Sequence, residues 1–292
     1  APDGTCILAN NDDNILRVFD LPRELHCQER WQKGRTLPEI EPALRVVEGG
    51  LVYDYCWYPL MSSWNPFFVS TSKDSPIHLW DAFNETLIPS SRQTGIVSCI
   101  CVNPAMPDIY AAGSYSKSVG LYTEPHGTLL CLLLGQSGGV TQIQFSSDGT
   151  KLFSGGRKDP EIICWDIRNP GNVLFTVKRK VETNQRIYFD ITSDSNYFVS
   201  GNTNGIVSIW DTTQISNSSG EEPVLSSFAN ISAHSDCVNG VSIHQQYPIL
   251  ATTSGQRHIV CSEIDPDSDS PDNNYEDTGL KLWWVGNTTS EP

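Results

Sequence analysis

The chain has 292 residues, a length that corresponds to one large domain or two ordinary ones. Its 38% hydrophobic content allows a core of ordinary size, which excludes a wholly disordered chain. Its longest apolar run, Leu129–Leu134, is too short to span a bilayer. The net charge of −15 argues against a nonspecific nucleic-acid binder, because such a protein needs a positive field.

A short apolar segment that ends near an aromatic residue recurs along the chain. The copies are Ile15–Asp20, Ile77–Asp81, Val119–Thr123, Ile162–Asp166, Val207–Asp211 and Leu280–Trp284. Their aromatic residues, Phe19, Trp80, Tyr122, Trp165, Trp210 and Trp283, are separated by 61, 42, 43, 45 and 73 residues. The three central spacings are typical of a WD40 repeat, which forms one four-stranded blade of a β-propeller.

A second position recurs in phase with these aromatic residues. Six residues before each aromatic residue stand, in order, Asp13, Asp74, Ser116, Asp159, Asn204 and Asp277. Asp and Asn favour turns because their side chains bond nearby backbone. We interpret Asp74 and Asp159, together with Trp80, Trp165 and Trp210, as structural positions of the repeat. A β-rich run precedes most of these turns, at Phe67–Ser70, Ile109–Ala112, Lys151–Ser154, Tyr197–Ser200 and Ile249–Thr252.

The pattern predicts an all-β WD40 propeller that forms one domain over residues 1–292. Two insertions interrupt it, at 22–47 and in a flexible acidic loop at 262–278. Within that loop Asp265–Asp277 contains six acids, two prolines and no base. Six blades are recognisable, and the first and last are each expected to lack a strand. The missing strands would come from residues upstream of Ala1, so we expect the chain to be part of a longer protein.

Several longer stretches resemble the telomerase Cajal body protein family, a group of WD40-repeat RNA-binding proteins. They are Val52–Ser63, Pro76–Phe83, Gly113–Tyr122, Ser154–Arg168, Thr183–Asp190 and Ser254–Arg257. The resemblance implies a seven-bladed propeller. Between Phe83 and Gly95 the family carries about one more blade, whereas this chain has only Asn84–Thr94. The sequence therefore predicts that one whole blade is absent.

The resemblance also implies a function. Proteins of that family bind small Cajal body RNAs and telomerase RNA through a short loop sequence, the CAB box, and deliver these particles to Cajal bodies. The implied partners are those RNAs and the protein components of telomerase and H/ACA ribonucleoproteins, with no direct DNA binding and no membrane. The implied location is the nucleus and the Cajal body, with a cytoplasmic pool left open.

Basic residues gather in the loops that a propeller would place on one face. The turns between second and third strands and the connections between blades hold Lys73, Arg92, Lys117, Arg157, Lys158, Arg179, Lys180, Arg186 and Arg257, with Lys178 beside them. Sites that bind RNA loops typically contain basic side chains that contact phosphates. Flat and amide side chains stand among them and contact unstacked nucleobases. The RNA-binding candidates are Lys73, Tyr115, Lys117, Arg157, Lys158, Gln185, Arg186, Gln256 and Arg257.

Two alternatives remain open at this point. The same loops are where Lys and Arg commonly lie, so the face could instead grip a peptide as an interaction scaffold. An enzyme is the more remote reading, because the sequence contains no phosphate-binding glycine loop and no Cys-x-x-Cys pair. We therefore expect no catalysis, no metal and no cofactor.

Overall fold

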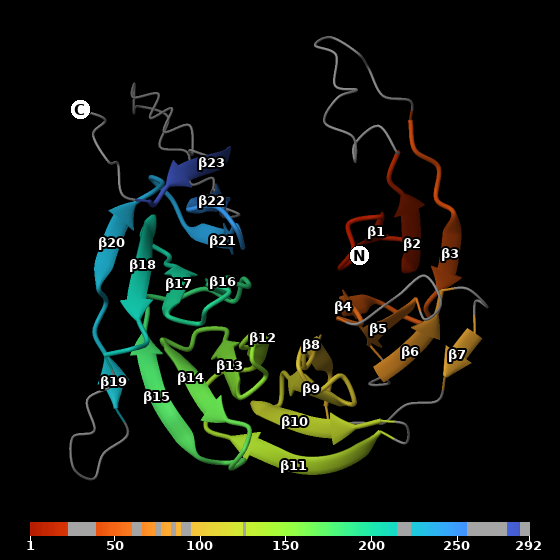
Figure 1. Ribbon diagram of the computed structural model, residues 1–292, viewed down its shortest axis with the longest axis horizontal. Coiled ribbons are helices and arrows are strands. Elements are labelled where there is room, and N and C mark those ends of the chain that lie inside the picture. The colour runs from red at the N-terminus through yellow and green to blue at the C-terminus, as the bar shows by residue number, and fades with distance from the viewer. Residues whose placement is uncertain are drawn as a thin grey trace, which may run out of the picture. The chain divides into compact units, whose positions relative to one another are not determined.

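A computed structural model describes residues 1–22, 39–59, 66–73, 77–82, 86–88, 95–124, 127–214, 223–255 and 279–286. Within these ranges all the regular secondary structure is β-strand, and the strands form six sheets (Figure 1). The first and last sheets have three strands each and the others have four or five. The predicted all-β fold with six blades, the outer two incomplete, is confirmed.

The first three sheets follow one another along the chain. The first contains β1 (Cys6–Asn10), β2 (Ile15–Asp20) and β3 (Leu44–Val47). The second contains β4 (Val52–Trp57), β5 (Phe67–Ser72), β6 (Ile77–Asp81) and β7 (Thr86–Ile88). The third contains β8 (Val97–Val102), β9 (Ile109–Ser114), β10 (Ser118–Thr123) and β11 (Thr128–Leu134).

The later sheets repeat this antiparallel order with one exception. The fourth contains β12 (Val140–Phe145), β13 (Lys151–Gly156), β14 (Glu161–Asp166), β15 (Val173–Lys178) and, from further along the chain, β19 (Val224–Leu225). The fifth contains β16 (Phe189–Ile191), β17 (Tyr197–Gly201), β18 (Ile206–Asp211) and β20 (Ala229–Ser232). The sixth contains β21 (Val238–Ile243), β22 (Ile249–Ser254) and β23 (Gly279–Trp284). The exception is β19, which pairs in parallel with β15.

The chain divides into two compact units. Unit 1 comprises Ala1–Gly155 and Trp165–Asn172, and unit 2 comprises Gly156–Cys164 and Val173–Pro292. Within unit 1, buried side chains of the first sheet, such as Leu16 and Val18, pack with Phe68 and Trp80 of the second. Within unit 2, Val199 and Val207 pack with Val241 and Leu250 of the last sheet. One domain over 1–292 stays a prediction.

The predicted turn positions lie where the repeat requires them. Asp13, Asp159 and Asn204 each lie in the turn that precedes a strand with a repeated aromatic residue. Each accepts a hydrogen bond from the backbone NH two residues later, at 3.2, 3.1 and 3.4 Å respectively. This Asx geometry explains why acids and amides recur there. Asp74 lies outside the described residues.

Three of the repeated tryptophans are fixed by a hydroxyl on the neighbouring strand. The indole NH of Trp80 donates to Ser70 Oγ at 2.8 Å, and that of Trp165 donates to Ser154 Oγ at 2.9 Å. Trp283 makes the same bond to Thr252 Oγ1 at 2.8 Å. Buried indole NH groups usually need such a partner. The prediction that Trp80, Trp165 and Trp210 are structural agrees with their exposures of 8%, 3% and 1%.

A different polar residue completes this network in each sheet. In the second sheet it is Glu48, which accepts from Ser70 and Trp80, and in the last it is His234, whose Nε2 lies 2.9 Å from Thr252 Oγ1. In the fifth sheet Arg179 donates to Ser200 Oγ at 3.2 Å. Glu48 and His234 each lie four residues before the first strand of their sheet, so this place in the fold accepts an acid or an imidazole, whereas Arg179 lies ten residues before β16.

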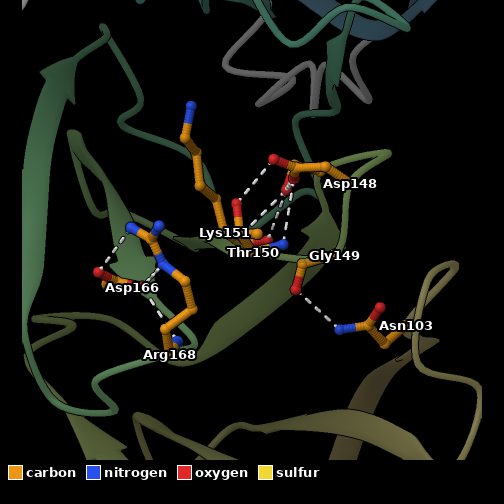
Figure 2. A network of polar contacts seen from close by, with 8 residues as sticks. Asn103, Asp148, Gly149, Thr150, Lys151, Asp166 and Arg168 are labelled. Atoms are coloured by element: carbon orange, nitrogen blue, oxygen red, sulfur yellow. Dashed lines mark hydrogen bonds and ion pairs between the residues drawn. The ribbon is translucent and has the colours of Figure 1, made fainter.

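Polar contacts also link successive sheets in unit 1 (Figure 2). The side-chain amide of Asn103, which follows β8, donates to the carbonyl oxygen of Gly149 in the β12–β13 turn at 2.9 Å. Asp148 braces that turn by accepting from the backbone NH and hydroxyl of Thr150 at 3.1 and 2.8 Å. Gly149 has φ +69, and a Cβ there would meet Asn103 Oδ1 at 2.2 Å, so the turn requires glycine.

Two predicted connections contain strands that sequence reasoning missed. The predicted insertion 22–47 ends in β3, because Leu44 and Val46 alternate as buried residues against β2. Similarly, β7 lies within Asn84–Thr94 and completes the second sheet. The acidic loop at 262–278 lies outside the described residues. No helix in the described part of the chain is long and apolar enough to cross a membrane.

Candidate nucleic-acid interface

A polar pocket in unit 2 is formed by three connections at one end of the strands. They are the β13–β14 turn, the β15–β16 connection and the β17–β18 turn. The pocket has a volume of about 510 Å³ and is lined by Lys158, Lys180, Glu182, Thr183, Asn184 and Thr203. Every lining residue is polar or charged, and the two lysines are exposed. The pocket therefore offers ammonium groups, hydroxyls and an amide to a polar ligand.

Backbone hydrogen bonds hold the three connections together. The NH of Lys158 donates to the carbonyl of Thr183 at 3.1 Å. The NH and hydroxyl of Thr203 both donate to the carbonyl of Lys180, at 2.9 and 3.1 Å. The NH of Lys180 in turn donates to Asn202 Oδ1 at 2.7 Å. Because the main chain at both lysines is anchored, their side chains start from fixed positions on the pocket rim.

Arg179, which precedes Lys180 in the β15–β16 connection, is a buried cation. It is 5% exposed, and its guanidinium donates to the carbonyls of Ile187 and Gly156 at 2.8 and 3.4 Å. Burial lowers the pKa of Arg179 to about 10, with Asp159 opposing the shift, so the side chain stays charged at neutral pH. Arg179 thus ties together the start of the β13–β14 turn and the end of the β15–β16 connection.

Arg186 and Tyr188 add a flat surface to the same connection. The guanidinium carbon of Arg186 lies 5.5 Å from the centre of the Tyr188 ring, and one of its NH groups donates to the Tyr188 hydroxyl at 3.0 Å. Tyr188 is 40% exposed. A guanidinium held against an aromatic ring forms a planar surface on which an unpaired nucleobase can stack.

Three predicted site residues lie in unit 1. Lys73 and Lys117 are exposed in the turns after β5 and β9. Tyr115, in the second of these turns, contacts the ring of Tyr53 edge to face at a centroid distance of 5.8 Å. The NH of Lys73 donates to the carbonyl of Leu51 at 2.9 Å, two residues before Tyr53. Unit 1 therefore contains a second, smaller group of basic side chains and aromatic rings.

The structure brings some predicted residues together and leaves others aside. Lys158 lies in the pocket, Arg157 precedes it, and Arg186 belongs to the connection that lines it. Gln185 is half-buried and its Oε1 atom is inaccessible to solvent, so that carbonyl is not offered to a ligand. Gln256 and Arg257 lie outside the described residues. Arg179 lies in the β15–β16 connection as predicted, but its side chain is buried, so its charge is not exposed with those of the other loop cations.

Sequence reasoning missed several polar residues that line the pocket. Glu182, Thr183 and Thr203 carry no positive charge and no aromatic ring, so a search for bases and rings passes over them. Thr203 could have been found, since it adjoins the turn position Asn204. Within the described residues no group of three or more His, Cys, Asp or Glu side chains is arranged to hold a metal ion.

Comparisons with known proteins agree with this fold. Residues 127–166, which span β11 to β14, match the WD40 family model, described as "WD domain, G-beta repeat". Telomerase Cajal body protein 1 of Mesocricetus auratus is 39% identical over 98% of this chain and 64% of its own length. The human protein of that name is 39% identical over 98% of this chain and 63% of its own length. The Drosophila melanogaster homolog is 31% identical over 99% and 65% respectively.

Two consequences follow from the extent of these matches. The chain spans a little under two thirds of the length of these relatives. The match to the Mesocricetus auratus protein also extends over 352 residues although this chain has 292, so the relative carries residues without a counterpart here, as the predicted loss of a blade requires. The family resemblance of the sequence motifs is confirmed: the chain is a WD40-repeat protein that is similar, over almost its whole length, to the telomerase Cajal body proteins.

Proposed function

We propose that the chain is a noncatalytic RNA-binding WD40 protein whose polar pocket in unit 2 holds part of an RNA loop. The observation that carries the proposal is the pocket itself, which is lined by two exposed lysines, Lys158 and Lys180. Two ammonium groups on one pocket of a protein of net charge −15 form a local positive site. Phosphates supply most of the affinity in such a site.

The neighbouring side chains suit single-stranded rather than duplex RNA. The Arg186–Tyr188 platform offers a stacking surface, while at the edge of an unpaired base Asn184 can donate or accept hydrogen bonds and Glu182 can accept them. Bases are available for stacking and edge contacts only where they are unpaired, as in loops and bulges. The platform lies in the β15–β16 connection, which also lines the pocket, so one RNA loop can contact both.

The names of the relatives extend the proposal to a cellular role. We propose that the RNA ligands are CAB-box-containing small Cajal body RNAs and telomerase RNA. The chain would associate with telomerase and H/ACA ribonucleoprotein components, act in the nucleus and direct the particles to Cajal bodies. Telomerase assembly and telomere maintenance would depend on that delivery.

A binding assay with matched hairpins tests sequence recognition. A CAB-box hairpin is compared with a hairpin of the same stem and a scrambled loop at physiological salt. We expect the CAB-box hairpin to bind at least about tenfold more tightly, because each well-made base contact discriminates by about 1–3 kcal/mol. Equal affinities would reject recognition of the loop sequence.

Charge reversal tests the location of the site. Arg157→Glu with Lys158→Glu should weaken hairpin binding and reduce the salt dependence of log K by about 1 for each phosphate that is no longer neutralised. The control is Lys151→Glu with Arg168→Glu, which makes the same charge change in the residues drawn in Figure 2. If both double variants weaken binding equally, only net charge matters and the pocket is not the site.

The second candidate function is an interaction scaffold that grips a peptide in the same pocket. Glu182 favours it, because a carboxylate on the rim repels phosphate and attracts a basic side chain. Affinity purification with and without nuclease separates the two functions. Partners bridged by RNA disappear after digestion, whereas a peptide bound directly in the pocket survives and is released by Glu182→Lys.

A further inference from the structure

We propose that a second, apolar groove in unit 2 docks a peptide segment that carries an aliphatic or aromatic side chain flanked by Lys or Arg. The groove has a volume of about 320 Å³ and is lined by Thr192, Tyr197, Val199, Ile209, Phe228, Ile243, Leu250 and Val285. These residues come from the fifth and sixth sheets. The proposal is independent of RNA binding, because no lining residue is shared with the polar pocket.

The groove and the polar pocket lie at opposite ends of one strand. Strand β17 begins at Tyr197, which lines the groove, and ends at Gly201, just before Thr203 of the polar pocket. A five-residue strand extends about 16 Å, so a ligand at one end leaves the other end accessible. The two sites can therefore be occupied at the same time.

The rim of the groove exposes large apolar side chains above a buried floor. Phe228 is 65% exposed and Val285 is 45% exposed, whereas Val199 and Leu250 are 4% and 1% exposed. The Phe228 ring lies 6.3 Å from that of Tyr197. Backbone bonds from Phe228 to Ile209 at 2.7 Å and from Val285 to Pro248 at 2.9 Å fix both edges. A rim that is already ordered loses little entropy when a ligand binds.

Charge determines which kind of partner fits. The sequence from Ile187 to Gly255 contains no Lys and no Arg. Two acids contact or pair with residues that line the groove. Asp194 accepts a hydrogen bond from the Thr192 hydroxyl at 2.5 Å, and Asp211 lies opposite Tyr197 in the β17–β18 pair. Hydrogen bonds from threonine hydroxyls, foremost among several, lower the pKa of both carboxyls, so both are charged at neutral pH. The apolar surface is therefore edged by negative charge.

This edge selects against other occupants. A second copy of the chain would bring a net charge of −15 toward the same sign, and a nucleic acid or an anionic lipid surface would be repelled in the same way. A basic peptide gains from both features, since its apolar side chain fills the groove and its cations meet Asp194 and Asp211.

Fluorescent ten-residue peptides provide the probe. One set has a central Leu, Ile or Phe flanked by Lys and Arg, a second replaces the flanks by Glu, and a third replaces the central residue by Ser. Fluorescence anisotropy should detect saturable binding for the first set alone, weakening as salt is raised. Absence of binding by the first set, or equal binding by the Glu-flanked set, would overturn the proposal.

Variants locate the binding. Phe228→Ala should weaken the best peptide by about tenfold or more, because it removes the large exposed aromatic ring that lines the groove. The control is Leu282→Ala, which removes an apolar side chain of similar exposure, 69%, that does not line the groove. Should Phe228→Ala lower the melting temperature, Val285→Ser offers a second rim variant. Equal losses in the rim and control variants would contradict the proposed location.

Sedimentation of the unliganded chain provides the last check. A monomer is expected over the concentration range of the peptide assay. A dimer that Phe228→Ala dissociates would assign the groove to a second copy and overturn the peptide proposal.

Discussion

The guanidinium of Arg179 donates to the carbonyl oxygen of Ile187 at 2.8 Å across the base of the β15–β16 connection. The same side chain also donates to the Gly156 carbonyl and to Ser200 Oγ. One buried cation therefore braces the β13–β14 turn and the β15–β16 connection, two of the three segments that form the polar pocket. This makes Arg179 a positioning residue for Lys158, Lys180 and Arg186 rather than a residue that touches the ligand.

Arg179→Gln should therefore lower both stability and RNA affinity. The shorter side chain leaves buried carbonyls without donors, which costs about 1–3 kcal/mol for each. Urea unfolding measures the first effect. For the second, the hairpin assay is run at a temperature where the variant remains folded. Arg179→Lys is the matched control because it retains the charge. An affinity that Lys restores without restoring stability would show that the charge matters more than the brace.

Glu48 should make stability depend on pH in the acid range. Burial raises the pKa of its carboxyl, but hydrogen bonds from His78, Ser70 and Trp80 outweigh this and hold the pKa below its usual value. A carboxyl with a lowered pKa in the folded state contributes stability above its unfolded pKa and loses it as pH falls through the folded value.

Glu48→Gln tests this linkage. The variant should be less stable by about 1–3 kcal/mol at pH 7, because a charged hydrogen-bond acceptor is removed. The difference from wild type should narrow as the pH is lowered through the range in which Glu48 protonates. Unfolding free energies measured from pH 7 to pH 3 provide the comparison, and parallel curves for the two proteins would contradict the role of Glu48.

Trp165→Phe separates the hydrogen bond of the repeat from its packing. The indole NH bonds Ser154 Oγ at 2.9 Å, and the ring is 3% exposed. Losing the bond while a ring remains should cost about 1 kcal/mol, plus the cost of leaving the serine hydroxyl buried, about 1–3 kcal/mol. The double variant Trp165→Phe with Ser154→Ala should recover part of that loss. Additive costs in chemical unfolding would indicate that the two side chains do not interact.

Gly149→Ala tests the link between the third and fourth sheets. Its positive φ costs an alanine about 1–2 kcal/mol, and the added Cβ also collides with Asn103 Oδ1 at 2.2 Å. Gly171→Ala is the control, since it has φ +93 and nothing lies within 4 Å of its Cβ. Thermal unfolding should rank Gly149→Ala below Gly171→Ala. Equal melting temperatures would mean that Asn103 moves away freely.

Much of the fold could be predicted from the spacing of six aromatic residues. Spacing reports strands and turns because turn chemistry at positions such as Asp159 and Asn204 is local, and the structure places both as expected. The short strand β3 escaped prediction because only Leu44 and Val46 face the core, which is too brief an alternation to separate from a loop.

The candidate site could be predicted only in part. Sequence position places Arg179 and Lys180 in the same connection, yet one is buried and the other exposed. What separates them is the environment supplied by Gly156, Ile187 and Ser200, which come from other segments. The groove around Phe228 had no sequence signal at all, because its apolar residues are scattered over two sheets.

The parallel pairing of β15 with β19 couples the order of synthesis to the order of folding. Thr176 and Val177 pair with Val224 and Leu225, and the whole of β16–β18 lies between them in the chain. As the polypeptide leaves the ribosome, the edge of the fourth sheet must wait for Leu225, by which time three strands of the next sheet have emerged. The four strands β12–β15 can pair before that point, but the outer edge of β15 stays unpaired until Leu225 has been made, so cutting the chain before Pro223 would leave that edge without its partner strand.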